Sequence, residues 1–303
     1  MLEKMPKILY HIYMKASSNQ LNNHNAQNGG MLYSFLVVCV FFISLIYSLI
    51  PESWGIKSVI VGYCLGPIAV LLAIVLLRVK VKNSLIAPLF PIKSNLWVIV
   101  STALIFVGLT FGLANLNVYF ASWLESLGVS VSEPSMPEFS PLNLALIIIT
   151  ACVLPAFFEE LAFRGIIVNS LKGTGAVFTA IASGLAFALF HMSPTQTLYQ
   201  FACGVVYALI VVCGGSFIHT FVIHLLNNLF VILNYYFFAI QTSVPLTIIG
   251  ALCLAGGIAL LLIKNKPEKT EKSLAKGERI SFVLSAFVGI AIAIAFWVQG
   301  LLL

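Results

Sequence analysis

The stretch Leu142–Ile167 reads LNLALIIITACVLPAFFEELAFRGII, and it decides the fold of this protein. It is long enough to cross a bilayer, which takes about 20 predominantly apolar helical residues. It nevertheless holds three ionisable side chains, those of Glu159, Glu160 and Arg164. Such groups are costly inside a membrane and mark functional sites by default. The stretch therefore predicts a membrane helix that carries a functional site.

The composition of the whole chain agrees with a membrane protein. Of its 303 residues, 60% are hydrophobic and 9% are charged, whereas soluble domains carry about 25% charged residues. This excludes a soluble globular enzyme, a disordered chain and a disulfide-stapled secreted domain. The apolar runs are continuous, unlike the alternating segments of roughly 10 residues in a membrane β-barrel. We therefore expect an all-α, polytopic transmembrane helix bundle.

The apolar runs predict about nine membrane spans, of which the fifth and sixth are short and lie deep in the bundle. The spans are expected at Met31–Ile50, Ser58–Leu77, Leu96–Tyr119, Leu142–Ile167, Gly175–His191, Thr197–Cys213, Phe217–Ala239, Leu246–Ile263 and Ile280–Leu302. They divide the chain into a flexible cytoplasmic tail (1–30), N-terminal helices (31–141), a core with the ionisable residues (142–240) and C-terminal helices (241–303).

The connections between spans predict the orientation in the membrane. Arg78–Lys93 and Lys264–Arg279 are basic connections, whereas Glu125–Glu138 is acidic. Nine alternating spans place both basic connections on one side, together with the N-terminus, and basic connections stay in the cytoplasm. We expect an integral protein of the bacterial plasma membrane with a cytoplasmic N-terminus. Cations confined to short connections are no nucleic-acid-binding surface, so no nucleic-acid partner is expected.

Helix geometry separates the two carboxylates. Glu160 and Arg164 are four residues apart, so they share a helix face and can form an ion pair. Glu159 is rotated about 100° away from Glu160, which leaves its carboxylate free for chemistry. The alternatives are a Glu/Arg cluster that only serves packing and a proton or substrate site of a transporter.

Later spans supply polar partners for a buried carboxylate. His191 ends the fifth span, and a carboxylate–imidazole pair can activate a water molecule. His224 and Asn228 share a face of the seventh span and can both donate hydrogen bonds, as an oxyanion hole requires. Polar contacts between helices are the alternative for this pair. Asn227 is a rival of Asn228, and His219 is expected to be a packing or rim residue.

Counting residues from the Lys172 and Gly215 connections gives the depth of these groups. At 1.5 Å per residue, Glu159 and Asn228 lie about 20 Å from that end, whereas His191 lies about 26–28 Å from it. Helix tilt or an early start of the fifth span would close this difference.

Three motifs now stand in order: Glu159-Glu160-x-x-x-Arg164, Phe187-x-x-x-His191 and His224-x-x-x-Asn228. Together they resemble the CPBP family of CAAX prenyl endopeptidases and bacteriocin-processing enzymes, over about Leu142–Asn234. The resemblance implies a glutamate-type intramembrane endopeptidase that opens towards the cytosol. It implies that Glu159 and His191 activate water, that His224 and Asn228 stabilise the oxyanion, and that Glu160 and Arg164 support the site.

The expected partners are the lipid bilayer and a membrane-associated peptide or protein substrate, and no cofactor is expected. The absence of Asp from the sequence excludes an aspartyl protease. A zinc metalloprotease is one alternative, with Glu159, His191 and His224 as ligands, although no HExxH motif is present. A non-catalytic bacteriocin-immunity or scaffold protein is another. The sequence leaves the substrate and the oligomeric state open.

Overall fold

The computed structural model describes residues 25–80, 95–130, 136–241, 243–267 and 272–302, and these residues form helices and loops with no strand among them. Seven helical segments are long and apolar enough to cross a membrane: Ala26–Tyr47, Ile56–Lys80, Leu96–Ser126, Pro141–Ser170, Phe217–Phe238, Val244–Lys264 and Ala275–Leu302. Two shorter apolar helices, Ala176–Phe190 and Thr197–Val212, are the fifth and sixth in order. The predicted all-α membrane bundle is confirmed, including its two short helices.

Several of these segments combine α-helical and π-helical turns. The uninterrupted helices are α2 (Asn25–Tyr47), α3 (Ile56–Lys80), α9 (Ala176–Phe190), α10 (Thr197–Val212), α12 (Val244–Lys264) and α13 (Lys272–Leu302). The third segment consists of α4 (Leu96–Val107), η4 (Gly108–Gly112) and α5 (Ala114–Ser126), and the seventh of α11 (Phe217–Leu233) and η7 (Asn234–Phe238). The fourth consists of α6 (Pro141–Ile147), η5 (Ile148–Val153), α7 (Leu154–Glu160), η6 (Leu161–Ile167) and α8 (Val168–Ser170). A 3-10 turn, η2 (Glu52–Trp54), precedes α3.

The first helix begins earlier than the sequence predicted. We expected a flexible tail through residue 30, but α2 starts at Asn25 and Ala26 is fully buried. The backbone N–H of Ala26 donates to Glu278 Oε2 at 3.3 Å. Small residues at this end let another helix approach closely, so the helix gains packing partners before the apolar run begins. The rest of the expected tail, residues 1–24, lies outside the described residues.

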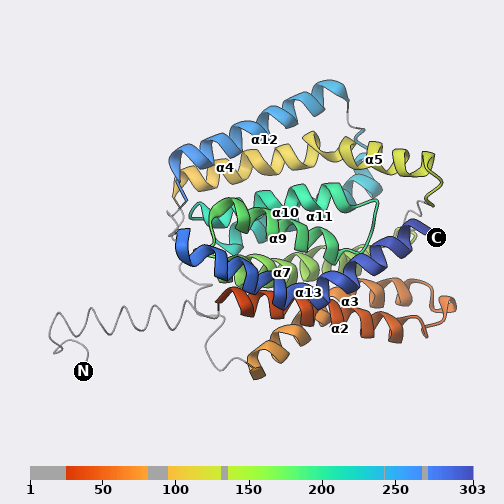
Figure 1. Cartoon of the computed structure of the whole chain (residues 1–303). Coiled ribbons are helices and arrows are strands. Elements are labelled where there is room, and N and C mark those ends of the chain that lie inside the picture. The colour runs from red at the N-terminus through yellow and green to blue at the C-terminus, as the bar shows by residue number, and fades with distance from the viewer. Residues whose placement is uncertain (1–24, 81–94, 131–135, 242, 268–271, 303) are drawn as a thin grey trace, which may run out of the picture.

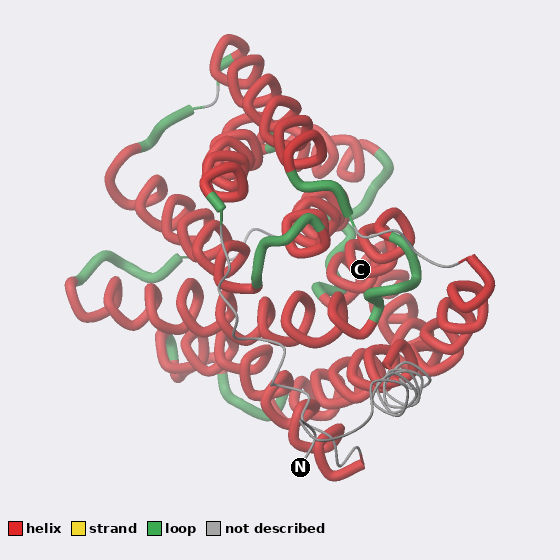
Figure 2. The backbone as a smooth tube through the Cα atoms, turned by 90° about the vertical axis from the view of Figure 1, so that its left-hand side faces the viewer, coloured by secondary structure: helices red, strands yellow, loops and turns green. Residues whose placement is uncertain are grey.

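The helices that carry the ionisable residues lie in the middle of the bundle. Figure 1 shows α7, α9, α10 and α11 between two groups of helices. One group is the pair α4 and α12, and the other is formed by α2, α3 and α13. Figure 2 shows the bundle turned by 90°, with helices joined by loops. The surrounding helices therefore cover the ionisable core on both sides.

Two glycines bring the short helices together. A Cβ atom on Gly204 of α10 would lie 2.7 Å from the Cα atom of Gly184 in α9, closer than real Cβ contacts. Ala180, Gly184 and Ala188 are buried small residues four positions apart, on one face of α9. This face lets α10 approach α9 closely.

The first and last described helices pack side by side. Ser34 Oγ in α2 donates to the carbonyl of Ser285 in α13 at 2.8 Å, across a separation of 251 residues in the chain. Ser34 Oγ also accepts a hydrogen bond from the N–H of Gly289 at 3.2 Å. A helix pair from opposite ends of the sequence thus closes this side of the bundle.

The described parts of the two basic connections lie at the same end of the bundle (Figure 1). Asn95 at the start of α4 donates to Asn265 at the end of α12, at 2.7 Å. Arg279 near the start of α13 donates to the carbonyl of Thr174 in the connection before α9. Glu125 lies near the end of α5, at the opposite end of the bundle.

Candidate active site

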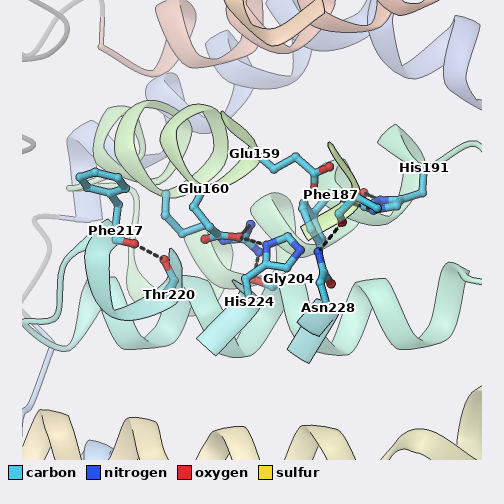
Figure 3. A network of polar contacts seen from close by, with 11 residues as sticks. Glu159, Glu160, Phe187, His191, Gly204, Phe217, Thr220, His224 and Asn228 are labelled. Atoms are coloured by element: carbon cyan, nitrogen blue, oxygen red, sulfur yellow. Dashed lines mark hydrogen bonds and ion pairs between the residues drawn. The ribbon is translucent and has the colours of Figure 1, made fainter. Parts of the chain in front are cut away.

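The predicted site residues come together from three helical segments (Figure 3). Glu159 and Glu160 end α7, and Arg164 follows in η6. His191 caps the C-terminus of α9. His224 and Asn228 lie one turn apart on α11 and extend towards the carboxylates.

Glu160 and Arg164 form the ion pair that their spacing predicted. Arg164 Nη1 donates to Glu160 Oε1 at 2.7 Å, and both side chains are 0% exposed. The guanidinium carbon lies 4.3 Å from the centre of the Phe187 ring and 5.0 Å from that of Tyr207. Arg164 Nη2 also lies 3.5 Å from the carbonyl oxygen of Gly204. A cation enclosed by aromatic faces and a carboxylate is held in one place.

The structure adds a second partner of Glu160 that the sequence did not reveal. His224 Nδ1 lies 3.0 Å from Glu160 Oε1, the same oxygen that binds Arg164. Arg164 has no acceptor to offer, so Glu160 accepts from both side chains. His224 Nδ1 therefore carries the proton of this hydrogen bond, which leaves its Nε2 for other contacts. The sequence could not find this contact, because Glu160 and His224 are 64 residues apart.

Glu159 and His191 form a separate and looser pair. Their closest atoms, Glu159 Oε2 and His191 Nε2, are 3.9 Å apart. His191 Nδ1 lies 2.8 Å from the carbonyl of Phe187, one turn back, so this nitrogen donates and Nε2 is left to face the carboxylate. Glu159 Oε2 is buried and has no hydrogen-bond partner. The distance is too long for a hydrogen bond, but one water molecule can contact both atoms.

The pairing of Glu159 with His191 resolves the depth difference found in the sequence. Helix α9 begins at Ala176, within one residue of the predicted start at Gly175, so an early start does not explain the difference. Glu159 Oε2 and His191 Nε2 nevertheless lie 3.9 Å apart. Counting residues from the connections therefore overstated the separation of these two groups along the bundle.

The loop that follows His191 is fastened by α13. Trp297 Nε1 donates to Thr197 Oγ1 at 2.7 Å, and this hydroxyl donates to the carbonyl of Ser193 at 2.8 Å. Met192 adopts a left-handed backbone conformation with φ of 51°. The sequence offered no signal for these contacts, because Trp297 lies on a span without any of the motifs.

The structure distinguishes the two neighbouring asparagines. Asn227 Oδ1 accepts a hydrogen bond from Tyr199 at 2.9 Å, on the side of α11 that faces α10. Asn228 Nδ2 instead donates to the carbonyl of Ala151 at 3.4 Å, and its side chain lies on the same side of α11 as His224 (Figure 3). Asn228, and not Asn227, is the amide that shares the site.

His219 lies outside this cluster, as the sequence predicted. Its Nδ1 accepts a hydrogen bond from the backbone N–H of Ser216 at 3.1 Å, in a capping box at the start of α11. The side chain thus stabilises the N-terminus of the helix that carries His224.

No three His, Cys, Asp or Glu side chains form a set of metal ligands within the described residues. Glu159, His191 and His224 are the residues proposed for zinc from the sequence. His224 directs Nδ1 to Glu160, and only its Nε2 remains as a possible donor atom. Of these three residues, Glu159 and His191 face each other, whereas His224 is paired with Glu160.

Comparison with known proteins supports the reading of the motifs. Residues 141–230 match the family model described as Type II CAAX prenyl endopeptidase Rce1-like. No curated protein and no solved structure matches the chain. The matched stretch is less than a third of the 303 residues, and it contains Glu159, Glu160, Arg164, His191, His224 and Asn228. The chain therefore carries a domain of the Rce1-like type II CAAX prenyl endopeptidase (CPBP) family.

Proposed function

We propose that this integral, multi-pass membrane protein is an endopeptidase that hydrolyses peptide bonds of membrane-associated substrates with a water molecule activated by Glu159 and His191. One observation carries the proposal. A buried carboxylate oxygen without a hydrogen-bond partner lies 3.9 Å from an imidazole nitrogen whose ring is already oriented by a backbone carbonyl. Two such acceptors hold and deprotonate a water molecule between them.

The reaction follows from the two pairs. The pair Glu159 and His191 takes a proton from water, and the hydroxide oxygen bonds to the carbonyl carbon of the substrate. The carbonyl oxygen becomes an oxyanion, to which Asn228 Nδ2 and His224 Nε2 donate. The C–N bond then breaks, and the proton held by the first pair passes to the leaving amine. A water molecule is consumed, and a carboxylic acid and an amine are formed.

Glu160 and Arg164 support this reaction without touching the substrate. His224 donates through Nε2 only when both ring nitrogens are protonated, because Nδ1 already donates to Glu160. The Glu160 carboxylate balances the charge of that ring, and Arg164 holds the carboxylate in place. The pair therefore acts through His224.

The test of the function is a comparison of membranes from cells that produce the wild-type protein or Glu159→Ala. Proteomic mapping of chain termini should find membrane-associated proteins that are cut only when Glu159 is present. A prenylated CAAX tail, a leader peptide and another membrane protein are the candidate substrates. Identical sets of termini in both membranes would contradict the proposal.

The orientation of the protein determines which substrates can reach the site. We propose that the basic end of the bundle faces the cytosol of a bacterial plasma membrane, because Lys and Arg in short connections resist translocation. Glu159 and Asn228 lie about 20 Å from that end, and we propose that a substrate tail reaches them from the cytosol.

Impermeant thiol labelling of intact cells should reveal this topology. In a background without the six native cysteines, Ser130→Cys at the acidic end should react, whereas Gly277→Cys at the basic end should react only after permeabilisation. Both positions are exposed, so accessibility within the protein does not limit either reaction. The opposite pattern would place the substrate outside the cell. Ser84, Ser135 and Ser273 offer further labelling positions, but Ser84, Ser135 and the side chain of Ser273 lie outside what the structure describes.

We propose that the reaction uses no metal, so chelation should leave peptide hydrolysis unchanged. The physical reason is that the Glu159–His191 pair provides a general base for the water molecule. A zinc ion would otherwise activate this water by lowering its pKa. Activity of the purified protein is measured before and after treatment with EDTA and phenanthroline, together with its zinc content. One zinc ion per chain, with activity lost on stripping and regained on adding zinc, would support a metalloprotease instead.

A further inference from the structure

The carbonyl that binds Asn228 lies four residues before a proline. In an α-helix, the carbonyl of Ala151 would accept the N–H of the residue four positions on, which is Pro155 and has no N–H. The helix is irregular here, since the N–H of Leu154 bonds to the carbonyl of Ile149, five residues back, at the end of the π-helical segment η5. Pro155 therefore cannot supply the α-helical donor of the Ala151 carbonyl.

Asn228 takes the place of this missing donor. Its Nδ2 donates to the Ala151 carbonyl at 3.4 Å, across 77 residues of sequence. An amide nitrogen has two N–H groups, so one can hold the side chain to Ala151 while the other remains for a second acceptor. The neighbouring Asn227 already has Tyr199 as its partner.

We infer that Pro155 is a positioning residue for Asn228, because it supplies no N–H to compete for the Ala151 carbonyl that fixes the direction of the Asn228 amide. The inference rests on the proposed function only for its catalytic consequence, which is that the second N–H of Asn228 is directed at the oxyanion. The hydrogen-bond relationship between Pro155, Ala151 and Asn228 stands without that function.

Pro155→Ala separates positioning from mere structural support. The new residue has an N–H that can donate to Ala151, so the helix can gain a bond and Asn228 meets a competitor for its acceptor. A structural role of the proline predicts loss of stability together with loss of activity. A positioning role predicts unchanged or higher stability with lower kcat. Pro245→Ala is the matched control, because Pro245 lies in the first turn of α12. The N–H of an alanine at this position would have no carbonyl acceptor within the helix.

The first measurement is a thermal-unfolding cycle on the purified full chain, and it needs no substrate. In the wild-type background, Asn228→Ala removes the hydrogen bond from this side chain to the Ala151 carbonyl and should lower Tm by roughly 2–4 °C. In the Pro155→Ala background, the new N–H binds that carbonyl, and the same substitution should lower Tm by less than half as much. If Asn228→Ala lowered Tm equally in both backgrounds, the inference would be overturned. A large loss of Tm from Pro155→Ala alone would also overturn it.

The second measurement is the hydrolysis of a farnesylated peptide ending in a CAAX sequence, presented in phospholipid vesicles. Pro155→Ala should lower kcat roughly 10- to 100-fold with KM unchanged, because a misplaced donor loses its effect in the transition state. Pro245→Ala should retain wild-type kcat. A wild-type kcat in Pro155→Ala would overturn the catalytic part of the inference. If the wild-type protein and Glu159→Gln are equally inactive on this peptide, that counts against this substrate and the proposed function, whereas the unfolding cycle still decides the inference.

Discussion

Glu159→Gln is expected to lower the rate of peptide hydrolysis roughly 10²–10⁴-fold, the range that a general base contributes. The amide has nearly the same shape as the carboxylate but cannot take a proton from water. Glu159 Oε2 has no hydrogen-bond partner to lose, so the variant should still fold. Turnover of the purified protein and its Tm, measured side by side, check both parts of this expectation.

Glu125→Gln provides the control for this variant. Glu125 is exposed near the end of α5, far from the site, and the same change of charge there should leave turnover as it was. Full activity in Glu159→Gln would remove Glu159 from the role of base. A fall in activity accompanied by an equal loss of folded protein would show that the carboxylate supports the structure instead.

Glu160→Gln should have the largest effect on stability, with a loss of about 3–5 kcal/mol, the range for breaking a buried ion pair. Glu160 Oε1 binds both Arg164 and His224, and the Arg164 side chain is fully buried. A neutral amide leaves this cation without its counter-charge in a medium that cannot solvate it. The loss appears as a lower Tm and as a lower yield of monodisperse protein after detergent extraction.

A double variant identifies the uncompensated charge as the cause. Glu160→Gln with Arg164→Met removes the anion and the cation together, so it should recover part of the stability that Glu160→Gln loses. Glu138→Gln, at an exposed residue, is the control for the change in side chain. If the double variant were less stable than Glu160→Gln, packing of Arg164 between Phe187 and Tyr207 would outweigh the charge.

The sequence predicted the features that depend on local pattern. Continuous apolar runs place helices in a membrane because the backbone has no other way to satisfy its hydrogen bonds there. The four-residue spacing predicted the pair of Glu160 and Arg164, and the rotation of Glu159 away from that pair left it free. These features depend on distances along one helix, which the sequence contains.

Features that depend on contacts between distant segments were not predictable in the same way. The bond from His224 to Glu160 joins α11 to α7, and no pattern in either helix specifies it. The early start of α2 at Asn25 comes with a contact to Glu278 of α13, at the other end of the sequence. The contact of His191 with Glu159 joins α9 to α7, whereas counting residues from the connections had put these two groups at different depths.

The pairing of α2 with α13 has a consequence for how the protein is made. Chains enter the membrane from the N-terminus onward during synthesis, so Ser34 spends the synthesis of about 250 further residues without its partner in α13. The same last described helix holds the loop after His191 through Trp297 and Thr197. The loop after His191 therefore gains its hydrogen bond from Trp297 only when α13, the last described helix to be synthesised, has reached the bundle.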